Sequence, residues 1–347
     1  MNDTSPTQER LTLEALQARL GQEIASTILV DPIAPSDVRR YANAVEDFNP
    51  LWHDDVAARA AGYDGPLAPP CLLLEFMRSP LGADHVDHRG ITIRPGAGPW
   101  GIPFEMPFPY VNPRRGQDEI VWQHPARLGD HITVSQRLSA AEEKTGHVGR
   151  FLTVTIDREY RNQENTLLLV HRQTTVWLPD DASRSPLRRR LPSVRRPLSG
   201  RTASAPARAA EIAPGDLLPP LHFGPLTIIH TVRWAAFTEN WYRVHFDREY
   251  AASEGEGAII ASGGFRLALI ARMLTDWLGT NGQLRRLLVR QAWPTHEGEV
   301  LTIAGQVEQC KATAAGTTVT CRVWGCDGEH REVLQGTAVV ELTGPRS

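Results

Sequence analysis

The stretch YANAVEDFNPLWHD (residues 41–54) decides the fold, because the chain repeats its pattern 193 positions later as WAAFTENWYRVHFD (residues 234–247). The same offset places LAPP (residues 67–70) over IASG (residues 260–263). A fixed offset between similar stretches is typical of a duplicated unit.

A second pair of matching stretches follows in the same order. PARLGDHIT (residues 125–133) matches PTHEGEVLT (residues 294–302) at an offset of 169, so the first copy carries about 24 extra residues between its two motifs. The Gly-, Pro- and aromatic-rich stretch 90–116 is where we expect this insertion. Two matches in one order predict two fused copies of one domain.

Length and composition agree with a globular protein of two domains, each with its own core. The chain has 347 residues, of which 41% are hydrophobic and 22% charged, and a net charge of −3. This charge gives no support to a nucleic-acid partner. No apolar run approaches the ~20 residues of a membrane helix, and the first ten residues lack an apolar signal core. The four cysteines are expected to be reduced thiols, so we predict a cytoplasmic protein.

The composition changes between the two copies. We predict an N-terminal domain over 1–183, an Arg/Pro-rich linker over 184–215 and a C-terminal domain over 216–347. The linker carries the basic runs 188–190 and 195–196. We expect it to be solvated, with the binding of an acidic carrier protein or a nucleotide phosphate as the alternative.

Each copy predicts one short helix, one longer apolar helix and then a run of strands. Ser36 is the expected cap of the first short helix, and Thr231 is expected near the start of its counterpart. Longer apolar helices are expected after Ala68 and after Ala261. Strands are expected at 119–122, 131–137, 151–156, 167–177, 300–304, 317–324 and 332–342. This order favours an α+β fold with an antiparallel sheet covered on one face.

The two motifs resemble those of one known superfamily. In the first copy, Asp47-x-Asn-Pro-x-Trp52-x-Asp54 and the following Ala61-Gly-Tyr stretch look like the FAS1-type dehydratase half of the MaoC-like hydratases and dehydratases. In the second copy, residues 240–247 are similar to the N-x-H-R-I-H-Y-D run of mesaconyl-CoA hydratase and of the mitochondrial 3-hydroxyacyl-thioester dehydratase. The resemblance implies a tandem, double hot-dog fold, in which each half wraps an antiparallel sheet around a central helix.

The resemblance also implies a reaction. A hydro-lyase of this superfamily dehydrates a 3-hydroxyacyl thioester or hydrates a 2-enoyl thioester of coenzyme A or an acyl-carrier protein, with no cofactor and no metal. Residues 85–88, HVDH, include residue types that bind metals, but we expect this stretch to be a loop. Gly263 and Gly264 are expected to polarise the thioester carbonyl at a helix N-terminus, or else only to allow close helix packing.

The proton chemistry is expected in the second copy. Relatives use an Asp and a His five residues apart, and here the pair is Asn240 and His245. Histidine acts as acid and base near neutral pH, whereas asparagine only orients a water or hydroxyl group. We therefore predict that His245 is catalytic and that Asn240 positions the reacting water. The alternative is a structural histidine in the core.

The first copy keeps the acid, Asp47, but has Trp52 in place of the histidine. Tryptophan performs no proton chemistry, so we expect this half to be non-catalytic and to form one wall of the substrate tunnel. Trp52 and Asp47 are therefore predicted to bind substrate, with a purely local hydrogen-bonding role as the alternative for Asp47.

Three neighbours of the second-copy motif complete the predicted binding site, namely Trp241, Tyr242 and Ser262. Tyr242 and Ser262 replace histidines of the relatives. A nucleophilic serine is the less favoured alternative, because no G-x-S-x-G pattern surrounds Ser262.

Two other functions stay open. The first alternative is a repurposed member of the superfamily that dehydrates or cyclises a polyketide-like specialised metabolite. The second is a non-catalytic acyl-binding protein. A homodimer of such two-domain chains is a further expectation.

Overall fold

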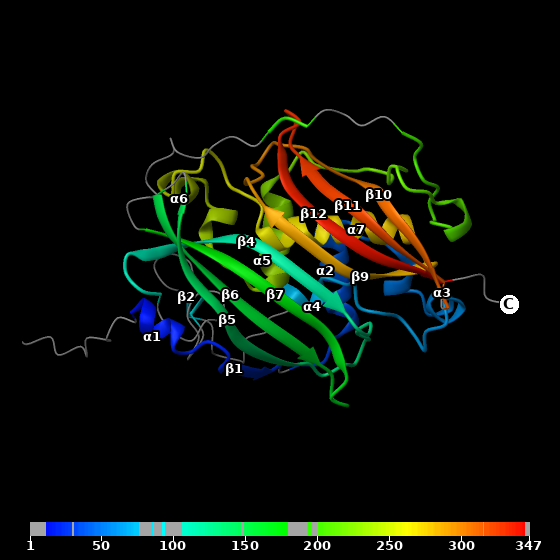
Figure 1. Cartoon of the computed structure of the whole chain (residues 1–347), viewed down its shortest axis with the longest axis horizontal. Helices are drawn as coiled ribbons and strands as arrows, with labels where there is room; N and C mark the ends of the chain where they lie inside the picture. The colour runs from blue at the N-terminus through cyan, green and yellow to red at the C-terminus, as the bar shows by residue number, and fades with distance from the viewer. Residues whose placement is uncertain are drawn as a thin grey trace, which may run out of the picture.

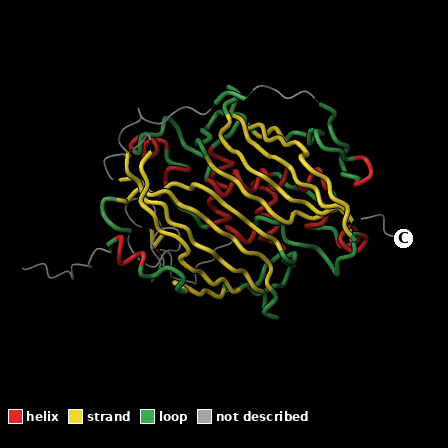
Figure 2. Tube along the Cα trace, in the orientation of Figure 1, coloured by secondary structure: helices red, strands yellow, loops and turns green. Residues whose placement is uncertain are grey.

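One large antiparallel sheet forms the body of the protein, and the helices lie against one of its faces (Figures 1 and 2). The computed structural model describes residues 12–29, 31–75, 85–86, 92–93, 106–146, 149–179, 193–195, 200–314 and 316–343. The ten strands follow the order β1-β5-β6-β7-β4-β9-β12-β11-β10-β8. The predicted antiparallel α+β fold is confirmed, and so is the double hot-dog arrangement.

The first half supplies strands β1 (Glu23–Ile28), β4 (Tyr110–Trp122), β5 (Thr133–Gly146), β6 (Gly149–Arg161) and β7 (Leu167–Pro179). The second half supplies β8 (Leu221–Phe223), β9 (Gly282–Gln291), β10 (Leu301–Thr313), β11 (Gly316–Cys326) and β12 (Glu332–Thr343). A separate two-stranded sheet pairs β2 (His85–Val86) with β3 (Thr92–Ile93).

The helices are α1 (Leu13–Gln17), α2 (Pro35–Val45), α3 (Asp55–Ala60), α4 (Leu72–Glu75), α5 (Ile228–Thr238), α6 (Arg248–Ser253) and α7 (Gly263–Leu278). Short 3₁₀ turns are η1 (Pro50–Trp52), η4 (Ala209–Glu211) and η5 (Arg243–His245).

The duplication predicted from the sequence reappears element by element. The bounds of α2, η1 and α3 coincide with those of α5, η5 and α6 when 193 is added to each residue number. Glu46 and Glu239, at the ends of α2 and α5, adopt left-handed backbone conformations with φ of 56° and 51°. Such a conformation is uncommon for a residue other than glycine, so its recurrence marks a shared local structure.

Two predicted helix starts were wrong. Helix α2 begins at Pro35, after Ala34, so Ser36 lies inside it. The carboxylate of Asp37 accepts a hydrogen bond from the Ala34 amide at 2.8 Å and so takes the capping role. Helix α5 begins at Ile228, and its N-cap is Thr227 rather than a residue near Thr231.

The 16-residue helix α7 is the central helix of the second half, and it confirms the long apolar helix expected after Ala261. Nearly all of its side chains are buried, because the sheet covers one side and α2 and α5 lie across the other. Its counterpart, α4, is described only over Leu72–Glu75, and the rest of the predicted helix lies outside the described residues.

The two halves share one large apolar core, and each half also has a smaller apolar cluster of its own. One cluster of buried apolar side chains runs from Leu29 in the first half to Leu342 in the second. Tyr41 of α2 packs against Trp234 and Phe237 of α5, with ring centroids 5.8 and 5.5 Å apart. The halves therefore pack against each other through a shared apolar core.

Strands β4 and β9 join the two halves into one sheet. Gln117 to Val121 pair antiparallel with Arg290 to Arg286, through backbone hydrogen bonds. Arg286 also donates to the Glu119 carboxylate at 2.7 and 2.9 Å. We call this junction the seam.

Parts of the predicted linker pack against the second half, although most of its described residues are exposed, as expected. Ala203 and Ala207 are buried, and the Ala207 amide donates to the Trp277 carbonyl at the end of α7 at 2.7 Å. Arg195 lies over the ring of Trp324, with its guanidinium carbon 3.9 Å from the centroid. The basic run 188–190 and Arg196 lie outside the described residues. Among the described helices, none is both long and apolar enough to span a bilayer.

Candidate active site

His245 ends the 3₁₀ turn η5 and is 9% exposed. Its Nδ1 atom lies 2.8 Å from the carbonyl oxygen of Ile260. A carbonyl only accepts hydrogen bonds, so Nδ1 carries the proton in the neutral ring and Nε2 carries the lone pair. Within the described part of the chain, no residue is paired with Nε2. This tautomer leaves a base facing the interior of the site.

The pKa of His245 is lowered to about 4, chiefly by burial and also by the positive charges of Arg266 and Arg114, although the hydrogen bond to Ile260 opposes these effects. The ring is therefore neutral at physiological pH. A neutral imidazole is ready to accept a proton but not to donate one first.

Asn240 and Ser262 share a small cavity with His245. About 210 Å³ of empty space, its opening to solvent included, lies between α5, η5 and the start of α7. The Asn240 side-chain oxygen accepts from the Tyr242 amide at 3.2 Å, and among the described residues the Asn240 NH₂ group meets no acceptor. The Ser262 hydroxyl accepts from the Phe265 amide at 3.2 Å and so caps α7. The structure brings this serine near the histidine, but as a helix cap.

Gly263 and Gly264 are the first two residues of α7. Their amides belong to the free N–H groups that every helix N-terminus presents, and in the described chain neither amide meets an acceptor. A Cβ atom at Gly263 would collide with the side chains of Arg115 and Gln291. Both roles expected for these glycines are compatible with this geometry: close packing, and an anion-attracting helix end beside the cavity.

The first half contributes positive charge to this site across the seam. Arg114, on β4, is close enough to lower the pKa of His245 and to interact with the Tyr242 hydroxyl. Its neighbour Arg115 lies against Gly263. Arg114 and Arg115 are therefore the residues through which the first half, which we predicted to form one wall of the site, reaches it.

A buried polar network holds Arg115 in place. Arg115 donates to both carboxylate oxygens of Asp118, at 2.8 to 3.1 Å, and His171 Nε2 lies 2.9 Å from the same carboxylate. Burial alone would raise the pKa of Asp118, but Arg115 and His171 hold it well below its usual range. Gln291 links this carboxylate to the helix, since its Nε2 atom donates to the Gly263 carbonyl at 3.0 Å.

Tyr242 and Trp241 precede η5 and are both half-buried. The ring of Tyr242 meets that of His245 edge to face at 5.8 Å, and its hydroxyl donates to Glu254 at 3.3 Å. Burial raises the pKa of Tyr242, so this hydroxyl stays protonated at neutral pH. Trp241 is not among the residues that line the His245 cavity.

In the first half, Asp47 and Trp52 form a hydrogen bond of their own. Trp52 Nε1 donates to Asp47 at 2.8 Å, and the Asn49 amide donates to the same oxygen at 3.3 Å. Burial raises the pKa of Asp47 to about 6, although the bond from Trp52 opposes this shift. Asp47 is 1% exposed and lies behind Trp52, so of the two predicted binding residues only Trp52 reaches a cavity.

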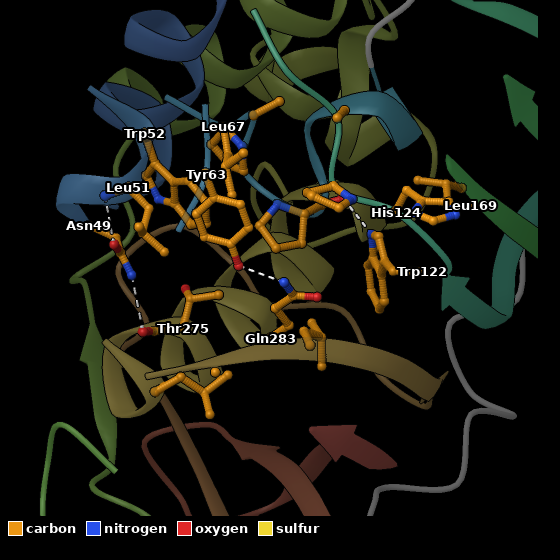
Figure 3. A pocket seen from close by; sticks show the side chains of 18 of the residues that line it. Asn49, Leu51, Trp52, Tyr63, Leu67, Trp122, His124, Leu169, Thr275 and Gln283 are labelled. Carbon is orange, nitrogen blue, oxygen red and sulfur yellow. Dashed lines mark hydrogen bonds between the residues drawn. The ribbon is translucent and has the colours of Figure 1, made fainter. Parts of the chain in front are cut away.

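That cavity has about 670 Å³ of empty space, its open mouth included. It lies between the first-half motif, the end of α7 and the start of β9, and we call it the first-half cavity (Figure 3). Trp52, Trp122 and Tyr63 line it together with leucines.

The sequence did not single out Arg114, Arg115, Asp118 or Gln291 as parts of the site. They lie on β4 and β9, outside the motifs, and the seam brings the β4 residues to α7. The available signal was the pair of adjacent arginines at the edge of a strand, which more often marks a solvated surface.

Residues 18–170 match the family model described as the FAS1-like, dehydratase domain region. Two subunits of a Mycobacterium tuberculosis 3-oxo-4,17-pregnadiene-20-carboxyl-CoA hydratase are also similar. The beta subunit is 30% identical over 133 residues, which cover 37% of this chain and 94% of that subunit. The alpha subunit is 38% identical over 52 residues, and the match spans 15% of this chain and only 17% of that subunit.

Two solved structures share the fold. A MaoC-like dehydratase superposes with a TM-score of 0.70 at 21% identity, over 95% of this chain and all of the other. The M. tuberculosis protein Rv0216, described as having a double hotdog fold, gives a TM-score of 0.58 at 15% identity, over 92% of this chain and 96% of the other. The motifs, the fold and these similarities agree, and the chain belongs to the MaoC-like hydratase/dehydratase superfamily.

Proposed function

We propose that the protein is a hydro-lyase that interconverts a 2-enoyl thioester and a 3-hydroxyacyl thioester at the second-half site. The observation that carries the proposal is the neutral His245 ring, whose Nδ1 is bonded to Ile260 and whose Nε2 is free beside Asn240 and the N-terminus of α7. A base, a water-orienting amide and an oxyanion site are the groups that this reaction needs.

In the hydration direction, the Asn240 NH₂ group orients a water molecule and His245 Nε2 removes its proton. The water oxygen forms a bond to C3, and the electron pair of the C2=C3 double bond moves toward the thioester carbonyl. The amides of Gly263 and Gly264 stabilise the resulting oxyanion, helped by the α7 dipole.

Protonated His245 then returns the proton to C2, which restores the thioester and the neutral ring. Dehydration follows the same steps in reverse. The low pKa of His245 favours this proton return, because the buried imidazolium is more acidic than an ordinary imidazolium.

The test measures the hydration of crotonyl-CoA and of longer enoyl-CoA substrates through the loss of enoyl-thioester absorbance. His245→Ala is expected to lower kcat/KM by about 10²- to 10⁴-fold, the usual contribution of a general acid–base group. The matched control is His222→Ala, because His222 is an exposed histidine of the same half that bonds only to Thr302 in the described chain. Full turnover by His245→Ala contradicts the proposal.

The panel of substrates also separates the alternatives. The hydratase whose subunits resemble this chain is named for a steroid-derived acyl-CoA, so a bulky alicyclic enoyl-CoA belongs in the panel. Turnover of a bulky pathway intermediate without hydration of simple enoyl-CoA substrates favours the repurposed enzyme. Thioester binding without turnover of any substrate favours the acyl-binding protein. The homodimer stays a prediction, which sedimentation analysis tests.

A further inference from the structure

The first-half cavity occupies the position that the duplication makes equivalent to the His245 site. Trp52 corresponds to His245, and Pro70 to Gly263, at the offset of 193. One hydrogen bond is repeated in both halves: Trp122 Nε1 donates to the Pro70 carbonyl at 2.9 Å, as Gln291 Nε2 donates to the Gly263 carbonyl at 3.0 Å. The two sites therefore share one scaffold.

Their linings differ completely. The His245 site has an imidazole and nearby guanidinium groups, whereas the first-half cavity is lined mainly by aromatic and aliphatic side chains and by prolines. Its charged rim residue, Arg285, is already paired with Glu341 at 2.6 Å. Its histidine, His124, is an exposed residue. Small-molecule sites are mostly apolar, with a few polar groups that fix the orientation of the ligand.

One wall offers two polar groups that point to a specific feature of the ligand. Gln283 Nε2 donates to the Tyr63 hydroxyl at 2.5 Å (Figure 3). In the described chain, the Tyr63 O–H then has no acceptor and the Gln283 side-chain oxygen has no donor. The pair is therefore able to donate to a carbonyl oxygen and to accept from a hydroxyl group.

We propose that the first-half cavity is a second ligand site, which binds a neutral molecule with an apolar ring or chain and one carbonyl or hydroxyl group. This goes beyond the proposed function, because no acid–base group faces the cavity from the described residues of the motif. The site is separate from the His245 site: Ser262 and Thr275, which line the two cavities, are 13 residues apart along α7, or about 20 Å at 1.5 Å per residue.

The experiment titrates the full chain with 2-acetylnaphthalene, a neutral ring ketone, and follows the fluorescence of the tryptophans. We expect saturable binding of one molecule per chain, unchanged in His245→Ala and without an effect on KM for crotonyl-CoA. Tyr63→Phe is expected to weaken the ketone about five- to tenfold, the effect of one lost hydrogen bond, and to leave 2-ethylnaphthalene, which has no oxygen, unaffected.

Ala68→Phe, which fills the cavity, is expected to abolish binding of both probes. A crystal of the unaltered protein grown with the ketone locates the probe even if Ala68→Phe does not fold. Absence of saturable binding, a probe located outside the first-half cavity, or competition with crotonyl-CoA overturns the proposal. Apart from the KM measurement, none of these results depends on whether enoyl thioesters are hydrated, so the two proposals fail separately.

Discussion

The two halves place different chemistry on the same scaffold. In the second half, η5 presents His245 to a small cavity surrounded by positive charge. In the first half, η1 presents Trp52 to a larger apolar cavity, and the acid Asp47 is sealed behind it. The backbone of the motif is retained in both, so the difference lies in a few side chains. Function therefore diverged at the lining of the sites while the elements that position them were kept.

The largest expected effect on the free energy of unfolding concerns the buried network around Asp118 in the first half. Asp118 and Arg115 of β4 correspond to Leu287 and Leu284 of β9, at the offset of 169. Asp118→Leu leaves the buried Arg115 guanidinium without its carboxylate, so we expect a loss of about 3–5 kcal/mol in the free energy of unfolding. Urea unfolding measures it.

The control is the double variant Asp118→Leu/Arg115→Leu, which copies the apolar pair of the other half. It is expected to recover most of the lost stability, because no charge is left buried and unpaired. A single variant that costs less than about 1 kcal/mol, or a double variant no better than the single one, would show that the ion pair is not the source of the difference.

Asp47 gives the next effect on stability, and the size of this effect depends on pH. Its folded-state pKa of about 6 lies above its ordinary value of 3.8, so burial of the charged form destabilises the protein above pH 6. Asp47→Asn is expected to raise stability at pH 7.5 by about 2–3 kcal/mol, at 1.36 kcal/mol per pKa unit. The gain should shrink as pH falls from 6 to about 4, where the carboxyl is neutral in both states. Thermal melts at pH 7.5 and 4.5 check this, and an equal effect at both pH values would contradict it.

Asn240→Asp transfers the acid of the first half to the second. A carboxylate near His245 is expected to raise the pKa of the imidazole by about one to two units from its value of about 4. The base is active when deprotonated, so the acidic limb of the kcat/KM profile should move to higher pH. The pH dependence of enoyl-CoA hydration measures it, with Asn240→Ser as the uncharged control. An unshifted limb would mean that position 240 does not act on His245.

The smallest effect tests the repeated hydrogen bond. Trp122→Phe removes the donor to the Pro70 carbonyl and is expected to cost about 1 kcal/mol. Gln291→Leu should cost more, because Gln291 also bonds to Arg266 and Asp118. Comparison of the two thermal melts checks the order, and the reverse order would show that the second half does not depend more on this bond.

The sequence was informative wherever a motif was local. The offset of 193 predicted which turns and helices would correspond, because η1 and η5 are built within a few residues of their own motif. Strand β9 was not predicted, because the arginines between its buried residues obscure the alternating pattern that is typical of a strand. Arg286 is accommodated there only because Glu119 faces it across the seam. The packing of Ala203 was missed for a similar reason, because isolated small residues carry no periodic signal.

The same limit applies to the site. The motif located His245 and Asn240, but the tautomer of His245 depends on the carbonyl of Ile260, 15 residues away. The network around Asp118 depends on strands that meet only after both halves have folded. No local pattern contains such contacts, so they could not be predicted from one sequence.

The seam has a consequence for symmetry. Two identical chains related by a twofold axis carry two identical sites, since every substitution in one appears in the other. Because β4 and β9 belong to one polypeptide, the equivalence at the axis is only approximate and a substitution changes a single site. Covalent fusion thus released each half from the constraint that a symmetric dimer imposes, and a tryptophan and a histidine now occupy positions that a dimer would have to fill alike.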